Sequence, residues 1–130
     1  MYEAIIEKIK ERLTGRELSA VIIPHISPDG DAAGSCSALW QVLDKVGIQA
    51  QLMTCDYIPD YLKWLKRIPD AISFQNRPKE CKHWLHQADI LFMLDHNTVA
   101  REGDLEPFVK EFEGEVIMID HHPDPDDVTY

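Results

Sequence analysis

The chain has 130 residues, of which 45% are hydrophobic and 28% charged, and its formal net charge is −10. This length and composition predict one soluble globular domain with a substantial core. No apolar run approaches the ~18 residues of a membrane-spanning helix, and residues 1–13 lack the pattern of a signal peptide. We therefore expect a cytoplasmic protein with no membrane partner.

The charge and the cysteines exclude two further classes. Without a cluster of Lys or Arg, a net charge of −10 argues against binding long duplexes, which relies on many cationic contacts to phosphate. It does not exclude phosphate substrates, because carboxylates can hold metal ions that then face the phosphate. Cys36, Cys55 and Cys81 form no CxxC pair, so they predict free thiols and no zinc ribbon.

In chain order, the first half of the sequence predicts a helix, a strand and a second helix. Apolar residues recur at helical spacing over 2–13, and Gly15 ends that helix. Residues 20–23 form a short β-branched run that is typical of a buried strand, and the prolines and glycine of 24–33 make that segment a loop. The next helical stripe begins at Gly34-Ser35 and is stopped by Gly47.

The second half continues the alternation, ending in a polar, proline-rich segment, 120–130, that heads toward another strand. Strands that are apolar on both faces, between amphipathic helices, predict an α/β fold: a mostly parallel central sheet with helices on both faces, a three-layer sandwich. The further expected strands are 49–53, 71–74, 90–94 and 116–119, and the further helices are 57–68, 79–86 and 106–112.

Histidines and aspartates follow each of the three clearest strands. Because ligands of an open parallel sheet lie beyond the carboxyl ends of its strands, these side chains are expected along one edge. They are His25, Asp29 and Asp31 after 20–23, Asp95 after 90–94, and Asp120, His121 and His122 after 116–119.

Each of these residues has an ordinary explanation when taken alone. A single Asp after a strand is usually a cap or turn residue, residues 28–31 (PDGD) resemble a turn, and paired histidines are often simply solvated. Together, however, carboxylates crowded at one edge would repel each other unless a cation neutralised them. The conjunction therefore predicts a metal site.

The ligand types indicate the kind of metal. Carboxylates and imidazoles without cysteine suit Mn²⁺, Fe²⁺, Co²⁺ or Mg²⁺. Asp29 and Asp31 are two residues apart and can face adjacent ions, which Asp95 would bridge. Two ions about 3.5–4 Å apart can clamp the attacking and leaving oxygens at phosphorus.

Three motifs carry a resemblance to a known family. Residues 25–35 (HISPDGDAAGS) resemble the first motif of the DHH phosphoesterases, and 120–122 (DHH) is the triplet that names the superfamily. Residues 94–97 (LDHN), followed by Arg101, resemble the second motif. The order and spacing of the three motifs match those of the family, and together the motifs cover nearly the whole chain. The PDGDA-GS form is similar to the bifunctional oligoribonuclease and 3′-phosphoadenosine 5′-phosphate (PAP) phosphatase group, often labelled exopolyphosphatase-like.

This resemblance implies roles for individual residues. The preferred cofactor is Mn²⁺ as two ions, with Mg²⁺, Co²⁺ or Fe²⁺ as alternatives. His122 is expected to face the substrate phosphate, and Asp120 to orient a histidine. Ser35 and Arg101 are candidate substrate contacts. The implied ligands are His25, Asp29 and Asp95 for one ion, and Asp31, Asp95 and His121 for the other.

The resemblance also implies an activity: hydrolysis of phosphate esters in short oligonucleotides, in PAP, or in both, by a two-metal mechanism. A cyclic-dinucleotide phosphodiesterase or a family II pyrophosphatase is the alternative within the superfamily. A nucleotide or metal sensor without turnover is the alternative from another class. The resemblance leaves open a homodimer of the full-length protein.

Two features of the family are missing from residues 1–130. The aspartate of its fourth motif has no counterpart, because Asp124, Asp126 and Asp127 come too soon after the DHH triplet. A second, DHHA1-type domain that grips the nucleotide is also absent. We therefore expect residues 1–130 to be the DHH domain of a longer protein, and to be weakly active alone.

Other histidines and the tryptophans could be mistaken for functional residues. His83 and His86 lie on the expected helix 79–86 and follow no clear strand, so surface or packing roles are expected. Trp40, Trp64 and Trp84 are interpreted as core or domain-packing residues and not as base-stacking platforms.

Overall fold

The computed structural model describes residues 2–14, 17–96 and 98–128. The predicted helix end at Gly15, the motif residue Asn97 and the strand expected at Tyr130 fall outside these ranges in whole or in part. No helix within them is long and apolar enough to cross a membrane.

The α-helices are α1 (Tyr2–Leu13), α2 (Gly30–Lys45), α3 (Pro78–Gln87) and α4 (Glu106–Lys110), and the strands are β1 (Ser19–Pro24), β2 (Gln49–Thr54), β3 (Ile72–Ser73), β4 (Ile90–Leu94) and β5 (Glu115–Ile119). Three 3₁₀ helices complete the fold: η1 (Asp60–Leu62), η2 (Ile68–Asp70) and η3 (Val99–Leu105).

The strands form one five-stranded sheet in the order β3-β2-β1-β4-β5, and all four pairings are parallel. The central strand β1 pairs with β2 on one side and β4 on the other, so Ile22 lies between Leu52 and Phe92. The chain first builds the sheet outward from β1 through β2 to β3, then crosses to β4 and β5. The order therefore reverses between β1 and β4, and the carboxyl ends of such strands are where open α/β sheets bind their ligands.

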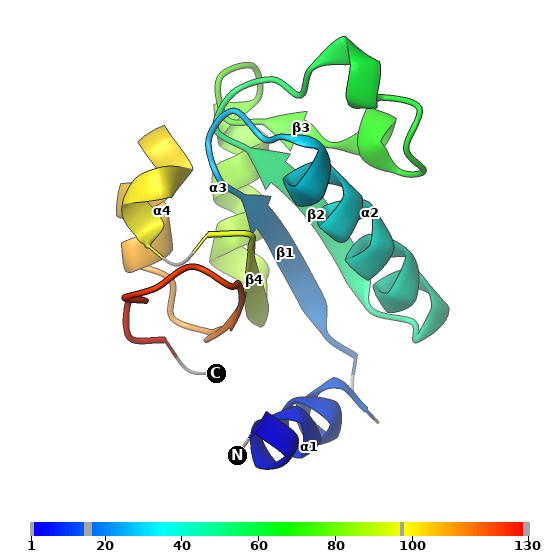
Figure 1. Ribbon diagram of the computed structural model, residues 1–130, viewed down its shortest axis with the longest axis vertical. Helices are drawn as coiled ribbons and strands as arrows, with labels where there is room; N and C mark the ends of the chain where they lie inside the picture. The colour runs from blue at the N-terminus through cyan, green and yellow to red at the C-terminus, as the bar shows by residue number, and fades with distance from the viewer. Residues whose placement is uncertain (1, 15–16, 97, 129–130) are drawn as a thin grey trace.

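Helices cover both faces of this sheet, which confirms the predicted three-layer α/β architecture (Figure 1). On one face, the α2 side chains Cys36, Trp40 and Leu43 pack against Ile22 and Phe92. On the other, Cys81 and Leu85 of α3 and Val109 of α4 pack against Val21, Ile23 and Leu91. Alternate side chains of β1 thus pack into the cores on opposite faces of the sheet, which explains why the sequence of this strand is continuously apolar.

Helix α2 begins earlier than the sequence predicted. We expected a loop over 24–33, but Pro24 belongs to β1 and the helix starts at Gly30. Asp29 is its N-cap, and one carboxylate oxygen accepts a hydrogen bond from the Ala32 amide at 3.0 Å. The Asp-Gly sequence that suggested a turn is also a good helix start, because a short acidic side chain can satisfy an otherwise unpaired amide.

The predicted helix over 57–68 was wrong. That segment contains only the short 3₁₀ helix η1, and Arg67 has a positive φ of 72° immediately before η2. Leu62 is buried as expected, but Trp64 is 79% exposed, so of the two roles predicted for it, core or domain packing, the core role is wrong. The segment has too few inward-facing apolar side chains to stabilise a regular helix by packing.

The two ends of the chain pack only partly on this core. Helix α1 forms as predicted, but it buries no residue completely, and only Ile9 and Leu13 contact the core. Residues 123–128 form no strand, although Val128 packs against the α3 face.

Candidate metal centre

Most of the predicted ligands meet at the carboxyl ends of β1, β4 and β5. His25 directly follows β1, and Asp95 directly follows β4. Since these strands are neighbours, Pro24 pairs with Leu94, and the two side chains emerge side by side. Strand β5 pairs with β4 and brings Asp120 to the same edge. Two groups of side chains could hold a metal ion, and the ligand atoms of each group lie within 4.8 Å of one another. The first group is His25, Asp29 and Asp95, and the second is Asp95, Asp120, His121 and His122.

In the first group, the imidazole of His25 faces two carboxylates. Its Nε2 atom lies 3.6 Å from Asp95 Oδ2 and 3.8 Å from Asp29 Oδ1. Its Nδ1 atom lies 2.7 Å from the Ile26 carbonyl oxygen and donates to it. In the neutral ring, Nε2 then directs a lone pair at two negative groups. A cation between them would turn this unfavourable arrangement into three ligands, so the donor set fits a divalent metal.

Asp29 is both an N-cap and a member of this group. The Ala32 amide that donates to its carboxylate holds the pKa of Asp29 below its usual value, and the nearby His25 acts in the same direction despite partial burial. The carboxylate is therefore ionised at neutral pH. Its side chain is 63% exposed, so it reaches the group from the solvent side.

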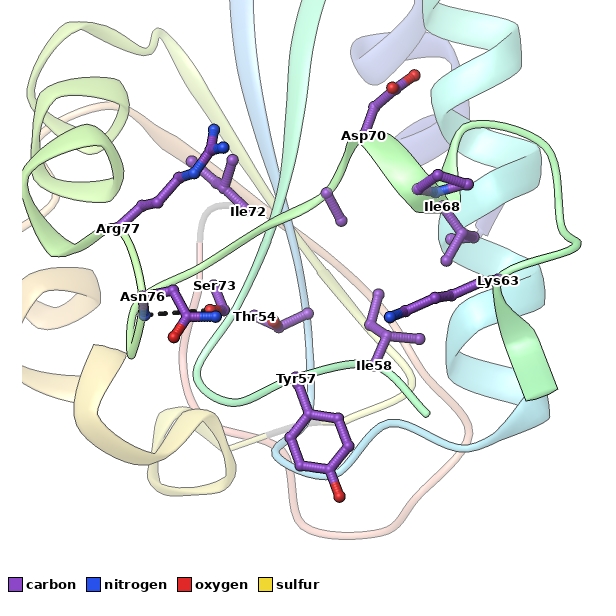
Figure 2. Close-up of a pocket in the computed structure, with 12 residues that line it drawn as sticks. Thr54, Tyr57, Ile58, Lys63, Ile68, Asp70, Ile72, Ser73, Asn76 and Arg77 are labelled. Carbon is purple, nitrogen blue, oxygen red and sulfur yellow. Dashed lines mark hydrogen bonds between the residues drawn. The ribbon is translucent and has the colours of Figure 1, made fainter. Parts of the chain in front are cut away.

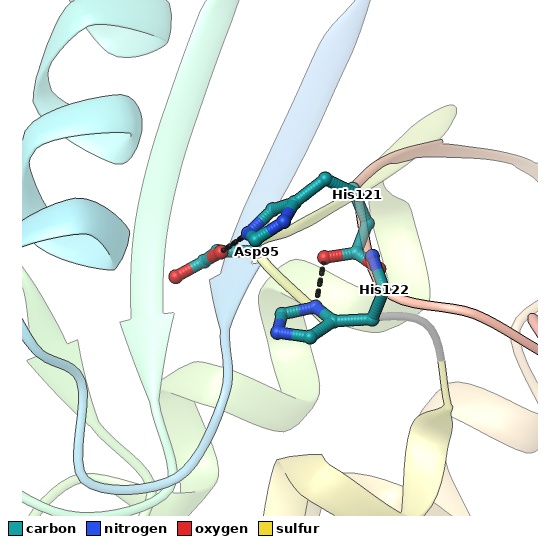
Figure 3. A group of neighbouring side chains, drawn as sticks. Asp95, His121 and His122 are labelled. Carbon is teal, nitrogen blue, oxygen red and sulfur yellow. Dashed lines mark hydrogen bonds and ion pairs between the residues drawn. The ribbon is translucent and has the colours of Figure 1, made fainter.

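Asp95 belongs to both groups. Its Oδ2 atom faces His25, and its Oδ1 atom lies 3.4 Å from Nε2 of His121 (Figure 3). The side chain is only 13% exposed. Asp95 also has a positive φ of 60°, a left-handed conformation that few side chains adopt without strain. One carboxylate whose oxygens face different histidines has the geometry that bridging requires.

Asp120 fixes the orientation of His122. One Asp120 oxygen lies 2.5 Å from His122 Nδ1, and the other accepts from the His122 amide at 2.8 Å. The Asp120 side chain is 2% exposed, which opposes ionisation, but the bonds from His122 outweigh burial and lower the pKa of Asp120. His122 Nδ1 therefore carries a hydrogen directed at Asp120.

A shallow cavity of about 400 Å³ opens onto the second group; it is lined by Asp31, Ser35, Asp95, Ile119, Asp120 and His121. Asp31 thus shares the cavity, but its carboxylate lies outside both groups of ligand atoms. Ser35 also lines the cavity, and its hydroxyl donates to the Ala32 carbonyl at 3.0 Å. We predicted a helix that begins at Gly34-Ser35, but α2 starts at Gly30, so Ser35 lies inside the helix and not at its first amides.

Arg101 does not line this cavity. Its carbonyl oxygen accepts a hydrogen bond from the Ile26 amide at 2.6 Å, and its side chain is exposed. Among the described residues, Arg101 therefore supports the loop after β1 through its backbone. His83 and His86 are exposed on α3 and belong to neither metal-binding group, in the position that the sequence indicated.

Glu102, a buried residue that is hydrogen-bonded to His96, was not identified from the sequence. His96 Nε2 lies 2.6 Å from Glu102 Oε1, both side chains are 0% exposed, and His96 Nδ1 lies 2.9 Å from the Leu94 carbonyl. Burial raises the pKa of Glu102, although the bond from His96 opposes that rise. His96 follows Asp95 directly, so the pair ties Asp95 to η3.

The same segment supports the loop that carries His25. Besides the Arg101 bond to Ile26, Gly103 has a φ of 61°, and a Cβ there would lie 2.7 Å from Cys55 Sγ and 3.0 Å from Ile26 Cδ1. Only glycine allows this close approach. The loop after β1 and the end of β4 are thus held by one bracing segment, η3, whose buried anchor is Glu102.

Comparison with known proteins agrees with this geometry. Residues 19–130 match the DHH family, N-terminal domain. The solved structure of an exopolyphosphatase-related protein from Bacteroides fragilis superposes with a TM-score of 0.92 at 31% identity, over 96% of this chain and 36% of that one. The chain therefore spans about a third of that protein. No functionally curated protein matches it. The family match covers the three ligand-bearing strand ends, and the chain belongs to the DHH family.

Proposed function

We propose that this chain is the metal-binding part of a hydrolase that cleaves phosphate esters with two divalent ions, preferably Mn²⁺. The observation that supports this proposal most is Asp95, which lies between His25 and His121 with one oxygen toward each. Membership of the DHH family and the structural likeness to an exopolyphosphatase-related protein support chemistry at phosphorus.

The chemistry of the donors supports the choice of metal. The two groups contain only imidazole and carboxylate ligands, which suit Mn²⁺, Mg²⁺, Co²⁺ or Fe²⁺ better than a thiolate-bound ion. The proposed ligands are His25, Asp29, Asp31, Asp95 and His121. When bound, such ions lower the pKa of water and neutralise charge on phosphoryl oxygens.

The protein's own groups have separate tasks in this proposal. Asp95 holds the two groups in register, and the Ile26 carbonyl keeps His25 in the tautomer that presents Nε2. His122 is the candidate catalytic residue that contacts the substrate phosphate, and Asp120 is its positioning residue. The amino end of α2 lies at the same edge, and its partial positive charge favours an anion there. The carboxylate edge can thus receive a phosphate only when cations offset its negative charge.

The proposed substrates are short oligonucleotides, PAP, or both, since the first motif has the form found in the oligoribonuclease and PAP phosphatase group. Cyclic dinucleotides and pyrophosphate are the substrates of the rival enzymes in the superfamily. A sensor without turnover is the remaining rival, and clustered carboxylates with matched histidines favour catalysis over it.

Metal binding and turnover test the proposal in two steps. Calorimetric titration with Mn²⁺ should detect binding that Asp95→Ala abolishes in both groups. Glu113→Gln, which removes an exposed charge just before β5 at the opposite edge of the sheet, is the matched control and should bind as the parent does. If Asp95→Ala binds two ions as tightly as the parent, the bridging assignment is wrong.

A substrate panel then separates the proposed activities. The full-length protein, loaded with Mn²⁺, is assayed on a dinucleotide, PAP, cyclic di-AMP and pyrophosphate, because residues 1–130 alone are expected to be weakly active. Phosphate or mononucleotide release from the first two supports the proposed class, and preference for the third or fourth supports a rival enzyme. Tight Mn²⁺ binding without turnover of any of the four would support a sensor.

A further inference from the structure

A second hollow opens at the carboxyl ends of β2 and β3, beside the strands that carry the metal-binding groups. This β2–β3 pocket has a volume of about 660 Å³, within the range of small-molecule sites (Figure 2). No residue of either metal-binding group lines it. Its main lining residues are Thr54, Ile58, Lys63, Ile68, Ser73 and Arg77.

The pocket combines an apolar floor with polar walls. Ile58, Ile68 and Ile72 are each no more than 6% exposed and supply the floor. Asn76 lines one wall, and its side-chain amide makes no hydrogen bond to any of the described residues. An amide can both donate and accept, so Asn76 can pair with the polar edge of a heterocyclic base whose face rests on the isoleucines.

Two cations stand on opposite sides of the pocket, Lys63 and Arg77 (Figure 2). Lys63 pairs with Asp60 at 2.8 Å and Arg77 with Glu80 at 3.5 Å, and all four side chains are at least 52% exposed. Exposed pairs of this kind contribute only about 0–1 kcal/mol. A phosphate can therefore replace either carboxylate at small cost, and its hydrogen bonds to an ionised donor are stronger than neutral ones.

The pocket lies next to the metal-binding groups along the same edge. Strand β2 is one strand from β1 and two from β4, which places the end of β2 roughly 10 Å from Asp95. Asp56 links the two regions: its carboxylate accepts from the amide and the hydroxyl of Ser27 at 3.1 and 3.0 Å, and its carbonyl accepts from Thr54. Ser27 belongs to the loop that leads to Asp29.

We propose that the β2–β3 pocket binds one nucleoside monophosphate unit, the nucleotide adjacent to the phosphate that is hydrolysed. The choice of a nucleotide chain as substrate rests on the proposed function. The isoleucine floor takes the base, Asn76 pairs with its polar edge, and Lys63 or Arg77 holds the phosphate. The pocket thereby selects a nucleotide chain over a substrate that has phosphate alone.

Binding to the pocket needs no metal, which allows a test independent of turnover. 5′-AMP is titrated into the full chain in EDTA, followed by calorimetry and by amide chemical shifts. We expect saturable binding with shifts at Thr54, Ser73 and Asn76. Ribose 5-phosphate and inorganic phosphate should bind more weakly, because neither carries a base.

Paired charge variants supply the control. Lys63→Ala with Arg77→Ala should weaken AMP binding about tenfold or more, since hydrogen bonds to charged donors are lost. Lys10→Ala with Lys110→Ala removes the same charge from two other exposed pairs and should bind as the parent does. Equal affinity of the two double variants, shifts confined to the ends of β1 and β4, or no AMP binding in EDTA would each overturn the inference. Mn²⁺ titration of the same samples reports separately on the metal centre.

Discussion

Replacing Glu102 with alanine should loosen the metal centre from a distance. The side chains of Glu102 and His96 are both 0% exposed and joined at 2.6 Å. Removing one partner of a buried hydrogen bond costs about 1–3 kcal/mol, and more where a charged group is left unpaired. Glu102 Oε2 is itself buried without a hydrogen-bond partner among the described residues, so the parent already carries part of that penalty. We therefore expect a loss of about 2–3 kcal/mol, or roughly 10 °C in Tm for a domain of this size.

Mn²⁺ affinity gives the readout that a purely structural role would leave unchanged. His96 follows Asp95, so losing its anchor should allow the Asp95 carboxylate to move and should weaken Mn²⁺ binding about 10–100-fold. Affinity is measured by calorimetry well below the Tm, and Tm by circular dichroism in EDTA. Glu102→Gln keeps a hydrogen-bonding partner for His96 and should stay within about 1 kcal/mol of the parent.

A nearby surface variant controls for the loss of a charge. Glu106→Ala breaks the partly exposed pair with Lys110 and should change stability by no more than about 1 kcal/mol, without affecting Mn²⁺ affinity. The bracing role would be refuted if Glu102→Ala melted within about 2 °C of the parent, or if it lost stability while keeping full Mn²⁺ affinity. Equal losses in the Gln and Ala variants would show that charge, and not the hydrogen bond, matters.

Three shorter predictions concern other parts of the chain. In EDTA, Asp95→Asn should raise the Tm by a few degrees while abolishing the stabilisation that Mn²⁺ gives the parent; an unchanged or lower Tm in thermal scans would contradict this. His83→Ala should leave Mn²⁺ affinity unchanged in calorimetry, because this side chain is exposed on α3, and a tenfold loss would show that it is a ligand. In native alkylation at pH 8 followed by mass spectrometry, Cys81 should react more slowly than Cys55, because burial raises the pKa of the Cys81 thiol to about 11; faster labelling of Cys81 would contradict this.

The sheet and the convergence of the candidate ligands could be predicted because both depend on short-range patterns. The apolar runs at 20–23 and 90–94 are buried on both faces, so their strands were recognisable without knowledge of their neighbours. Parallel strands place their carboxyl ends at one edge, and this brings His25 next to Asp95. The parallel topology therefore brings candidate ligands from three separate segments of the sequence into one cluster.

Glu102 could not be predicted for the opposite reason. It lies in a polar segment, 99–105, without helical or strand periodicity, where an acidic residue is ordinarily solvated. Its burial depends on tertiary contacts, among them the hydrogen bond to His96, and a local sequence pattern does not reveal these. The start of α2 was missed for a local reason: Asp29 is equally suited to a turn and to a helix cap, and the choice depends on the helix that follows.

The metal centre is assembled against local preferences, and Asp95 shows this most clearly. Its φ of 60° costs backbone energy, and its carboxylate lies within 4.8 Å of ligand atoms from both Asp29 and Asp120. Two like charges at that separation repel by roughly 1–3 kcal/mol between bulk water and a protein surface. Solvent screens the share of Asp29, which is 63% exposed, so the nearly buried Asp120 contributes most. An asparagine at position 95 would remove this repulsion and tolerate the same φ. The cluster of carboxylates therefore lowers the stability of the unliganded fold. Cations that bind there would restore that stability, and they would present a positive charge to a phosphate.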